Sequence, residues 1–377
     1  MIKVNLQYRW QSSPGTGQPI DENLFRVLLS IAECGSIAGT SRRLGISYRH
    51  VWGLVGKWGK VFGQPLAELR QGHGASLTDF GRRLLWAEQL VQARLTHQIE
   101  DVRREIEQVL AEASPAPRLT VCASHDLALA ALRDRLAQAE GLKLDLRFQA
   151  SLESLAALAK NQCVLAGFHV AEGMEKATLA RFRRHLKQGR HALVGVATRT
   201  QGLMLARGNP KSIASLADLA GPRVRFINRQ RGSGSRVEFD QLLSGAGIDP
   251  ASIEGYGNEE FTHVAVAATI ASGKADAGFG IRAAAAQYEL EFVPLLSERY
   301  YLAYRTEALE DPLVVQLVEL LRGEAFRTLL GALPGYGTGI TGVTFDVSTA
   351  LSARGYCISK AVRSSSKKVA AKRATAL

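Results

Sequence analysis

The 377-residue sequence lacks the features that mark membrane and secreted proteins. No apolar run approaches the roughly 20 residues that a membrane-spanning helix needs, and the longest are short alanine-rich stretches such as 264–271. The first ten residues, MIKVNLQYRW, contain no apolar segment of the kind found in signal peptides. We therefore expect a cytoplasmic protein without a membrane partner.

Cysteine is scarce, and histidine shows no metal-binding pattern. The four cysteines lie far apart, at positions 34, 122, 163 and 357, and none forms a CxxC pair. The eight histidines include no HExxH motif. Buried thiols in a reducing compartment fit this pattern better than disulfides or zinc. The sequence predicts no metal site.

Acidic residues are absent from the end of the sequence. After Asp346 the chain contains seven Lys or Arg residues and no Asp or Glu, so residues 347–377 supply more than half of the net charge of +12. This composition predicts a basic, disordered tail. Two interpretations of the tail stay open: a non-specific contact with DNA, or solvated chain without a partner.

A segment with two prolines divides the chain. Residues 111–118, AEASPAPR, interrupt helix-like sequence and are expected to form a linker. After them, expected strands alternate with expected helices. The strands are 119–123, 143–148 and 164–170, and the helices are 126–139 and 152–160. This alternation predicts an α/β domain, residues 119–346, with a mainly parallel sheet.

The N-terminal part, residues 1–78, has the pattern of a helix-turn-helix. A first helix over 21–32 is followed by small residues, by Gly45 at a left-handed position and by Ser47 as the N-cap of a second helix. That helix has an apolar stripe of Val51, Leu54, Val55 and Trp58. Between residues 36 and 66 there are five Lys or Arg and no carboxylate, as phosphate contact requires. The alternative is an ordinary helical hairpin with a solvated basic face.

A glycine-rich hairpin and a long helix follow. Residues 66–70 and 75–77 are expected to pair as a wing, and Thr78 is expected to cap a helix over 79–110. In that helix apolar residues repeat at 4-3-4-3 spacing, as in a coiled coil: Leu95, Ile99, Val102, Ile106 and Val109. This seam predicts a homodimer; the alternative is packing against the chain's own second domain.

The second domain contains a Gly/Ser-rich loop, 228–236, between an expected strand over 223–227 and an expected helix over 237–243. Converging N–H groups, hydroxyls and a helix N-terminus favour an anion. No Lys stands in the Walker position, so nucleotide hydrolysis is not indicated. Ser124 and Ser151 also follow expected strands, and plain helix capping is the alternative role for both.

Two resemblances sharpen this interpretation. The run GSIAGTSRRLGISYRHVWGLVGKW, followed by the hairpin and SLTDFGRRLL, resembles the LysR-like winged helix-turn-helix of the molybdate-responsive repressors. That resemblance implies a dimer that reads double-stranded operator DNA, with Ser47 to Lys57 in the groove and Arg42 and Arg43 on the backbone. The implied DNA-binding residues are Arg42, Arg43, Ser47, Tyr48, Arg49, His50, Trp52 and Lys57.

The second domain resembles another family. The segments QGLMLARGNPKSI, DLAGPRVRFINRQRGSGSRVEFDQLL and GYGNEEFTHVAVAATIASGKADAGFGIRAAA are similar to the two-lobed, type 2 periplasmic-binding-protein-like domain of molybdenum-related regulators and molybdopterin-biosynthesis proteins. The resemblance implies ligand binding between the lobes. The candidate ligand-binding residues are Ser124, His125, Ser151, Arg229, Gly232, Ser233, Gly234, Ser235, Arg236 and His263. For Arg229 and Arg236, ion pairs within a lobe are the alternative; for His263, it is a hydrogen bond to a strand-end carbonyl.

Together these features predict a DNA-binding transcriptional regulator, dimeric or tetrameric, that senses molybdate or tungstate. One alternative effector is a pterin-type molybdenum cofactor or a small organic acid such as formate. A remote alternative is a cofactor-assembly enzyme. Because the sequence shows no nucleophile with a general base, we expect no catalytic residues and no covalent cofactor.

Overall fold

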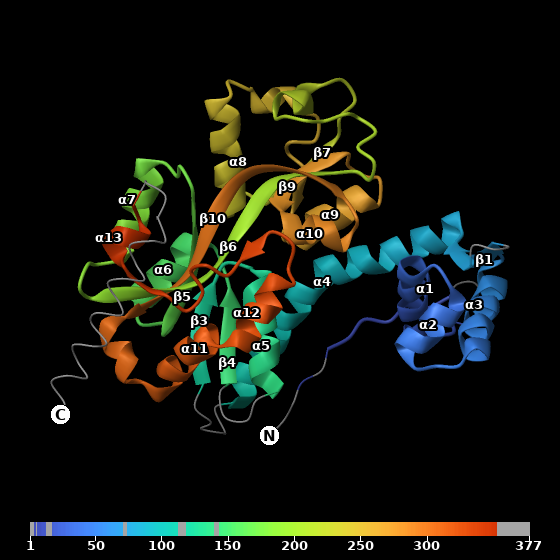
Figure 1. Ribbon diagram of the computed structural model, residues 1–377, viewed down its shortest axis with the longest axis horizontal. Helices are drawn as coiled ribbons and strands as arrows, with labels where there is room; N and C mark the ends of the chain where they lie inside the picture. Colours follow the sequence, from blue (N-terminus) through green and yellow to red (C-terminus); the bar gives the residue numbers. More distant parts are fainter. Residues whose placement is uncertain are drawn as a thin grey trace. The chain divides into compact units, whose positions relative to one another are not determined.

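The computed structural model describes residues 4, 6–12, 17–70, 74–111, 118–138 and 143–352. The chain divides into two compact units, residues 1–114 with 271–274, and residues 115–270 with 275–377 (Figure 1). Among the described helices, none combines the length and the apolar composition that crossing a membrane requires.

Unit 1 is a winged helix-turn-helix followed by a long helix. Its elements are α1 (Glu22–Cys34), α2 (Ile37–Leu44), α3 (Tyr48–Phe62), β1 (Ala67–Arg70), β2 (Gly74–Leu77) and α4 (Asp79–Ala111). The apolar faces of α1 and α3 share one core, which includes Leu24, Leu28, Ile31, Val51 and Trp58. This arrangement confirms the predicted helices and the predicted hairpin.

The ends of the helices explain why the turns are sharp. Ser36 and Ser47 cap α2 and α3, each accepting from the third backbone N–H beyond it, and Gly45 ends α2 with a φ of 66°. Gly74 starts the second wing strand at a φ of +82°, where a Cβ would lie 2.2 Å from the carbonyl oxygen of Gly35. Only glycine fits this close approach of the wing to the end of α1. The tip of the wing, residues 71–73, lies outside the described residues.

Unit 2 has two lobes that share two long strands. Its principal sheet has the order β4-β3-β5-β10-β6-β9-β7-β8, and the short strands β11 (Tyr336–Gly337) and β12 (Thr344–Asp346) pair with β6. The strands of lobe 1 are β3 (Arg118–Ala123), β4 (Lys143–Phe148) and β5 (Leu165–Ala171); those of lobe 2 are β7 (Phe226–Arg229), β8 (Glu259–Glu260) and β9 (Ala277–Ile281). The 15-residue strands β6 (His191–Leu205) and β10 (Glu291–Arg305) pair with each other and run through both lobes (Figure 1).

The helices cover both faces of the sheet. Lobe 1 carries α5 (Leu127–Gln138), α6 (Ser151–Ala159), α7 (Lys176–His185), α11 (Pro312–Arg322), α12 (Glu324–Gly331) and α13 (Val347–Ala350). Lobe 2 carries α8 (Gly234–Gly245), α9 (His263–Ala271) and α10 (Arg282–Gln287). Three 3-10 turns, η1 (Ala217–Ala220), η2 (Pro250–Ser252) and η3 (Thr306–Glu310), complete the unit.

The fold differs from the sequence prediction in three places. The sheet is parallel within each lobe, but β6 and β10 pair antiparallel with their neighbours, so the mainly parallel sheet is right only for the lobe strands. The strand expected over 223–227 is β7, Phe226–Arg229, and the helix expected from 237 is α8, which begins at Gly234. The tail expected from 347 starts instead with α13, whose Val347 and Ala350 are buried. Residues 353–377 lie outside the described residues.

Candidate functional site

The exposed side of α3 carries the predicted DNA-binding residues. Val51, Leu54, Val55 and Trp58 are buried. The predicted DNA contacts are all exposed, on α3, in the turn before it and at the end of α2: Arg42, Arg43, Ser47, Tyr48, Arg49, His50, Trp52 and Lys57. Each of these side chains is therefore open to solvent, as contact with DNA requires, and their role in DNA binding stays a prediction.

Two of these residues also have local partners. The Ser47 hydroxyl accepts from the His50 backbone N–H at 3.1 Å, so it caps α3, and its own proton stays available to a phosphate. Arg43 forms an ion pair with Glu33 of α1 at 2.5 Å. Because both partners of that pair are substantially exposed, the pair is weak, and a phosphate can compete for the guanidinium.

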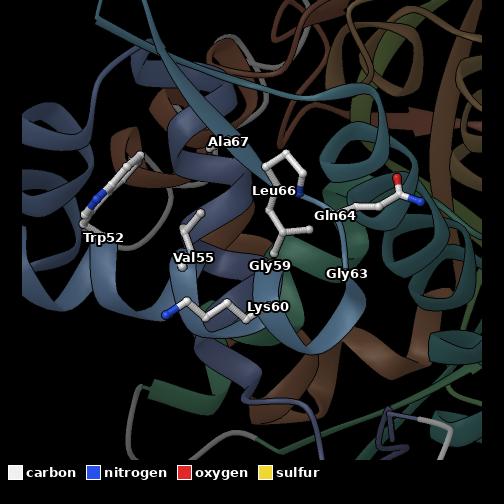
Figure 2. A pocket seen from close by; sticks show the side chains of 10 residues that line it. Trp52, Val55, Gly59, Lys60, Gly63, Gln64, Leu66 and Ala67 are labelled. Atoms are coloured by element: carbon white, nitrogen blue, oxygen red, sulfur yellow. The ribbon is translucent and has the colours of Figure 1, made fainter.

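A hollow of about 470 Å³ lies beside the C-terminal half of α3 and the turn into β1 (Figure 2). Its lining includes Trp52, Gly56 and Gly59 of α3 and Pro65 and Leu66 of the turn that follows. Gly56 leaves the helix surface bare, because nothing lies within 4 Å of the position where its Cβ would be. Sequence reasoning did not identify this hollow.

Helix α4 presents part of the predicted seam to solvent. Val102 and Ile106 are 48% and 37% exposed, and Leu95 and Ile99 are half-buried. The side chain of Val109 lies outside the described residues. Nearer its start, the buried Glu88 of α4 accepts hydrogen bonds from Tyr8, Trp10 and Gln92. No sequence signal indicates this contact of the N-terminal segment with α4.

In unit 2, the ends of the lobe 1 strands converge on His169 of β5. Its Nδ1 lies 3.3 Å from the Ser124 hydroxyl and 3.5 Å from the Ser151 hydroxyl. The Tyr300 hydroxyl donates to the Ser124 carbonyl oxygen at 2.8 Å. Ser124 does not cap α5, because Asp126 has that role through the Ala128 backbone N–H. The two predicted serines are thus joined by a histidine that the prediction had not assigned to the site.

In lobe 2, a second cluster of polar side chains lies near the starts of α8 and α9. The Ser235 hydroxyl lies 3.4 Å from Nε2 of His263, and the Nδ1 of His263 is buried without a hydrogen-bond partner among the described residues. Burial, with the nearby Arg229, lowers the pKa of His263 well below its ordinary value. Burial also lowers the pKa of Arg229 to about 10, with Arg199 as the second cause. The Arg229 guanidinium donates to the Phe261 carbonyl oxygen at 2.8 Å, while its Nε has no partner among the described residues.

The Gly/Ser segment forms the start of α8. Gly232 has a φ of +84°, and the Ser233 hydroxyl caps the helix through the Arg236 N–H. Arg236 is held inside lobe 2: it donates to Asp240 at 3.0 Å and to Glu259 at 3.3 Å, and it lies 4.2 Å from the Tyr256 ring centroid. These contacts match the alternative of an ion pair within the lobe.

A cavity of about 60 Å³ lies between the two lobes. Three of the predicted residues line it: Ser151 from lobe 1, and Gly232 and Gly234 from lobe 2. Arg181 of α7 and Glu238 of α8 also line it, and sequence reasoning missed both. The other predicted residues do not line it; His125 packs its ring 4.9 Å from that of Phe148. The loop expected to bind an anion therefore borders a small open space at Gly232 and Gly234, although the His169 ring packs against Gly234.

Behind the cavity lies a buried network of charges. Arg199 of β6 pairs with Glu298 of β10 and, at 2.5 Å, with Asp126, which also accepts from the Tyr336 hydroxyl. Glu238 accepts from Gln201 at 2.9 Å. Burial and the nearby Glu298 raise the pKa of Glu238. Burial also acts to raise the pKa of Glu298, but the charges of Arg199 and His169 and the hydrogen bonds from Arg199 and Gln201 together lower it. No local motif reveals this network, because its members come from five separate segments.

Comparison with known proteins agrees with this architecture. Residues 133–322 match the PBP superfamily domain, and residues 23–82 match the bacterial regulatory helix-turn-helix protein family of lysR type. The uncharacterized protein YvgK of Bacillus subtilis is 33% identical over 197 residues, which are 52% of this chain and 63% of YvgK. The molybdenum-pterin-binding protein MopA of Rhodobacter capsulatus is 39% identical over 76 residues, which are 19% of this chain and 29% of MopA. The chain thus spans less than two thirds of either relative.

Among solved structures, the LysR family transcriptional regulator CbnR is 18% identical, with coverage of 79% of this chain and 98% of CbnR and a TM-score of 0.38. The family models match both units, each over the elements described above. Through residues 133–322 the chain belongs to the PBP superfamily, and it joins that domain to an N-terminal helix-turn-helix of the lysR family of bacterial regulatory proteins.

Proposed function

We propose that this protein is a DNA-binding transcriptional regulator whose second unit binds a small anion, molybdate or tungstate, between its lobes. The observation that carries the proposal is the inter-lobe cavity, where the Ser151 hydroxyl and the backbone of Gly232 and Gly234 border the start of α8. A helix N-terminus with free N–H groups and a hydroxyl is a favourable environment for negative charge. Arg181 adds a positive charge at the same cavity.

The size of the cavity favours a small ligand. About 60 Å³ is far below the roughly 300–1,000 Å³ of pockets that hold drug-sized molecules. A compact oxyanion needs little opening of the lobes, whereas a pterin needs a wide one. The similarity to a molybdenum-pterin-binding protein supports a role in molybdenum metabolism and makes a molybdenum–pterin the second candidate.

DNA binding is proposed from unit 1. The exposed face of α3 has cationic and polar groups, and no carboxylate occurs between residues 36 and 66. Val102 and Ile106 of α4 expose apolar surface that a second copy of α4 would cover. A homodimer of this kind presents two α3 helices to a pseudo-palindromic operator. The lysR match supports a regulator over the alternative of a cofactor-assembly enzyme.

Calorimetry on the full chain tests the effector. We expect molybdate and tungstate to bind, and Arg181→Gln to weaken binding by about threefold to tenfold through loss of an exposed charge. The matched control is Arg184→Gln, which removes the same charge from an exposed position of α7 that does not line the cavity. If neither oxyanion gives binding heat and the purified protein retains a pterin, the effector is a molybdenum–pterin and not an oxyanion.

Gel-shift titration tests the DNA-binding surface, with a duplex that the full chain selects from a random library. Arg49→Ala should weaken binding by about tenfold, because the side chain lies at the start of α3. Arg207→Ala, at an arginine of unit 2 that is 79% exposed, removes the same charge as a control. Equal losses in both variants would mean that net charge, and not the α3 face, determines affinity.

A further inference from the structure

Three buried side chains, from both lobes and from a strand that the lobes share, point at one another at the inter-lobe cavity. His169 lies on β5 of lobe 1, Glu298 on the shared strand β10, and Glu238 on α8 of lobe 2. One nitrogen and two carboxylate oxygens, one atom from each residue, all lie within 4.8 Å of one another. All three residues are at least 96% buried.

Two of the three atoms that face one another, both carboxylate oxygens, have no hydrogen-bond partner among the described residues. Nε2 of His169 is 3.7 Å from Oε1 of Glu238 and 3.8 Å from Oε2 of Glu298, which is too far for hydrogen bonds. These same two oxygens, Glu238 Oε1 and Glu298 Oε2, are buried without a partner among the described residues. Leaving two such acceptors unsatisfied is costly. A cation between the three atoms would satisfy both.

The remaining atoms of these side chains are held by neighbours. Nδ1 of His169 faces the hydroxyls of Ser124 and Ser151, the other oxygen of Glu238 accepts from Gln201, and the other oxygen of Glu298 pairs with Arg199. Metal ligands in proteins are oriented in this manner by a surrounding set of hydrogen bonds. The inward-facing atoms are therefore already directed at a common point.

The balance of charge indicates a divalent ion. In their ionised forms Asp126, Glu238 and Glu298 are three carboxylates, and Arg199 forms ion pairs with two of them, Asp126 and Glu298. Arg229 donates to the Phe261 carbonyl oxygen and forms no ion pair with these carboxylates in the described part of the chain. Buried charges need partners, and a cation bound to Glu238 and Glu298 would offset the excess of negative charge.

We propose that His169, Glu238 and Glu298 form a site for one divalent transition-metal ion. An imidazole nitrogen with two carboxylates suits zinc or manganese better than magnesium or calcium. Around a tetrahedral zinc ion with bonds of about 2.0–2.1 Å, ligand atoms lie roughly 3.3–3.5 Å apart. The observed separations from Nε2 exceed this by only a few tenths of an ångström.

The site also bears on the proposed anion. His169 and Glu238 line the inter-lobe cavity, so a carboxyl group borders a space that we assign to a negatively charged ligand. A metal ion bound there reverses the local charge and favours an anion beside it. Because its ligands come from both lobes, the ion would also join lobe 1 to lobe 2. The metal site itself does not depend on which anion binds.

Zinc binding by the full chain, without DNA or oxyanion, tests the proposal. After treatment with a chelator, Zn²⁺ is titrated in competition with a chromogenic indicator. We expect one ion per chain, and a loss of affinity of at least about tenfold in Glu238→Gln. Glu260→Gln is the matched control, since Glu260 is also a buried carboxylate of lobe 2 but accepts from Thr269 instead. Unchanged affinity in this control is expected.

Co²⁺ provides a second measurement that does not require the Glu238 variant to fold. Bound to the wild-type chain, Co²⁺ should show visible absorption bands of a nitrogen- and oxygen-ligated ion, and His169→Gln should remove them. If the wild type binds neither ion at one per chain, or if Glu238→Gln and His169→Gln bind as tightly as the wild type, the metal site is refuted. Zinc binding without any molybdate binding would refute the proposed effector and leave the metal site standing.

Discussion

At Gly234 the backbone of lobe 2 passes against the His169 ring of lobe 1. A Cβ at Gly234 would lie 2.2 Å from Nε2 of His169, which is not a flexible side-chain end but a buried ring. We expect Gly234→Ala to lower the free energy of unfolding by about 1–3 kcal/mol, as overpacking does. Urea denaturation measures this change.

Gly245, at the other end of α8, is the control for that prediction. Nothing lies within 4 Å of the position of its Cβ, and its φ is not positive. Gly245→Ala should therefore be neutral, or should stabilise by up to about 1 kcal/mol through the higher helix propensity of alanine. Equal effects of the two substitutions would show that Gly234 is not at a close contact between the lobes.

Asp276 gives a prediction of pH dependence. Hydrogen bonds from the Arg225 side chain and its backbone N–H hold the pKa of Asp276 below its ordinary value of 3.8. A carboxyl with a lowered pKa stabilises the fold above its unfolded pKa, and this contribution is lost as the pH falls through the folded pKa. Asp276→Asn should therefore cost stability at pH 7 and progressively less below about pH 3.8.

Unfolding by urea at pH 7 and at pH 3 measures the difference between wild type and Asp276→Asn. In an Arg225→Gln background the same change should have a smaller pH-dependent effect, because the side-chain hydrogen bonds are already lost. An effect of Asp276→Asn that is the same at both pH values would contradict the assignment. Arg225 is 45% exposed, so solvent screens the pair and the effect stays modest.

At the scale of the elements, α4 gives a prediction about dimer formation. Ile106 is 37% exposed on a seam that also includes Val102, so Ile106→Glu would place a charge where a second α4 is proposed to pack. We expect the variant to dissociate at concentrations where the wild type is dimeric, as measured by sedimentation equilibrium. Gln98→Glu introduces the same charge at an exposed position of α4 outside the seam and should leave the dimer intact. If Ile106→Glu remains dimeric, the apolar seam of α4 is not the dimer interface.

The elements also show which parts of the fold the sequence could predict. β3, β4, β5 and α6 lie within one or two residues of their predicted bounds, because their apolar pattern is local. The long strands β6 and β10 were not predicted, since buried Arg199, Gln201 and Glu298 interrupt their apolar pattern. The charges of Arg199 and Glu298 are tolerated there only because partners from distant segments neutralise them.

In the candidate site, too, residues in local motifs could be predicted and residues from distant segments could not. Ser151, Gly232 and Gly234 could be predicted because a strand, a small-residue loop and a helix start are sequence signals, and all three line the cavity. His169, Glu238 and Glu298 could not, because they are 69 and 60 residues apart and share no motif. Their proximity is produced by the strand order β5-β10-β6 and by the docking of α8, neither of which a local pattern encodes.

At the scale of the whole molecule, the proposed function requires that the two units be coupled through free energy. If molybdate binds one arrangement of the lobes better, and DNA binds the same state of the chain better or worse, each ligand changes the affinity of the other. Thermodynamic linkage requires that the factor by which molybdate changes operator affinity equals the factor by which operator DNA changes molybdate affinity. We expect molybdate to change operator affinity by about 5-fold to 150-fold, and operator DNA to change molybdate affinity by the same factor.

Fluorescence anisotropy of a labelled operator with and without molybdate gives the first factor, and calorimetry with molybdate on free and operator-bound protein gives the second. Arg181→Gln should weaken molybdate binding in both states and leave the factor itself unchanged, because its charge acts on the anion and not on the DNA. In Ile106→Glu the factor should fall toward one, since a monomer does not fix the spacing of two α3 helices. Tight binding of both ligands with a factor of one would mean that the anion does not regulate DNA binding in this protein.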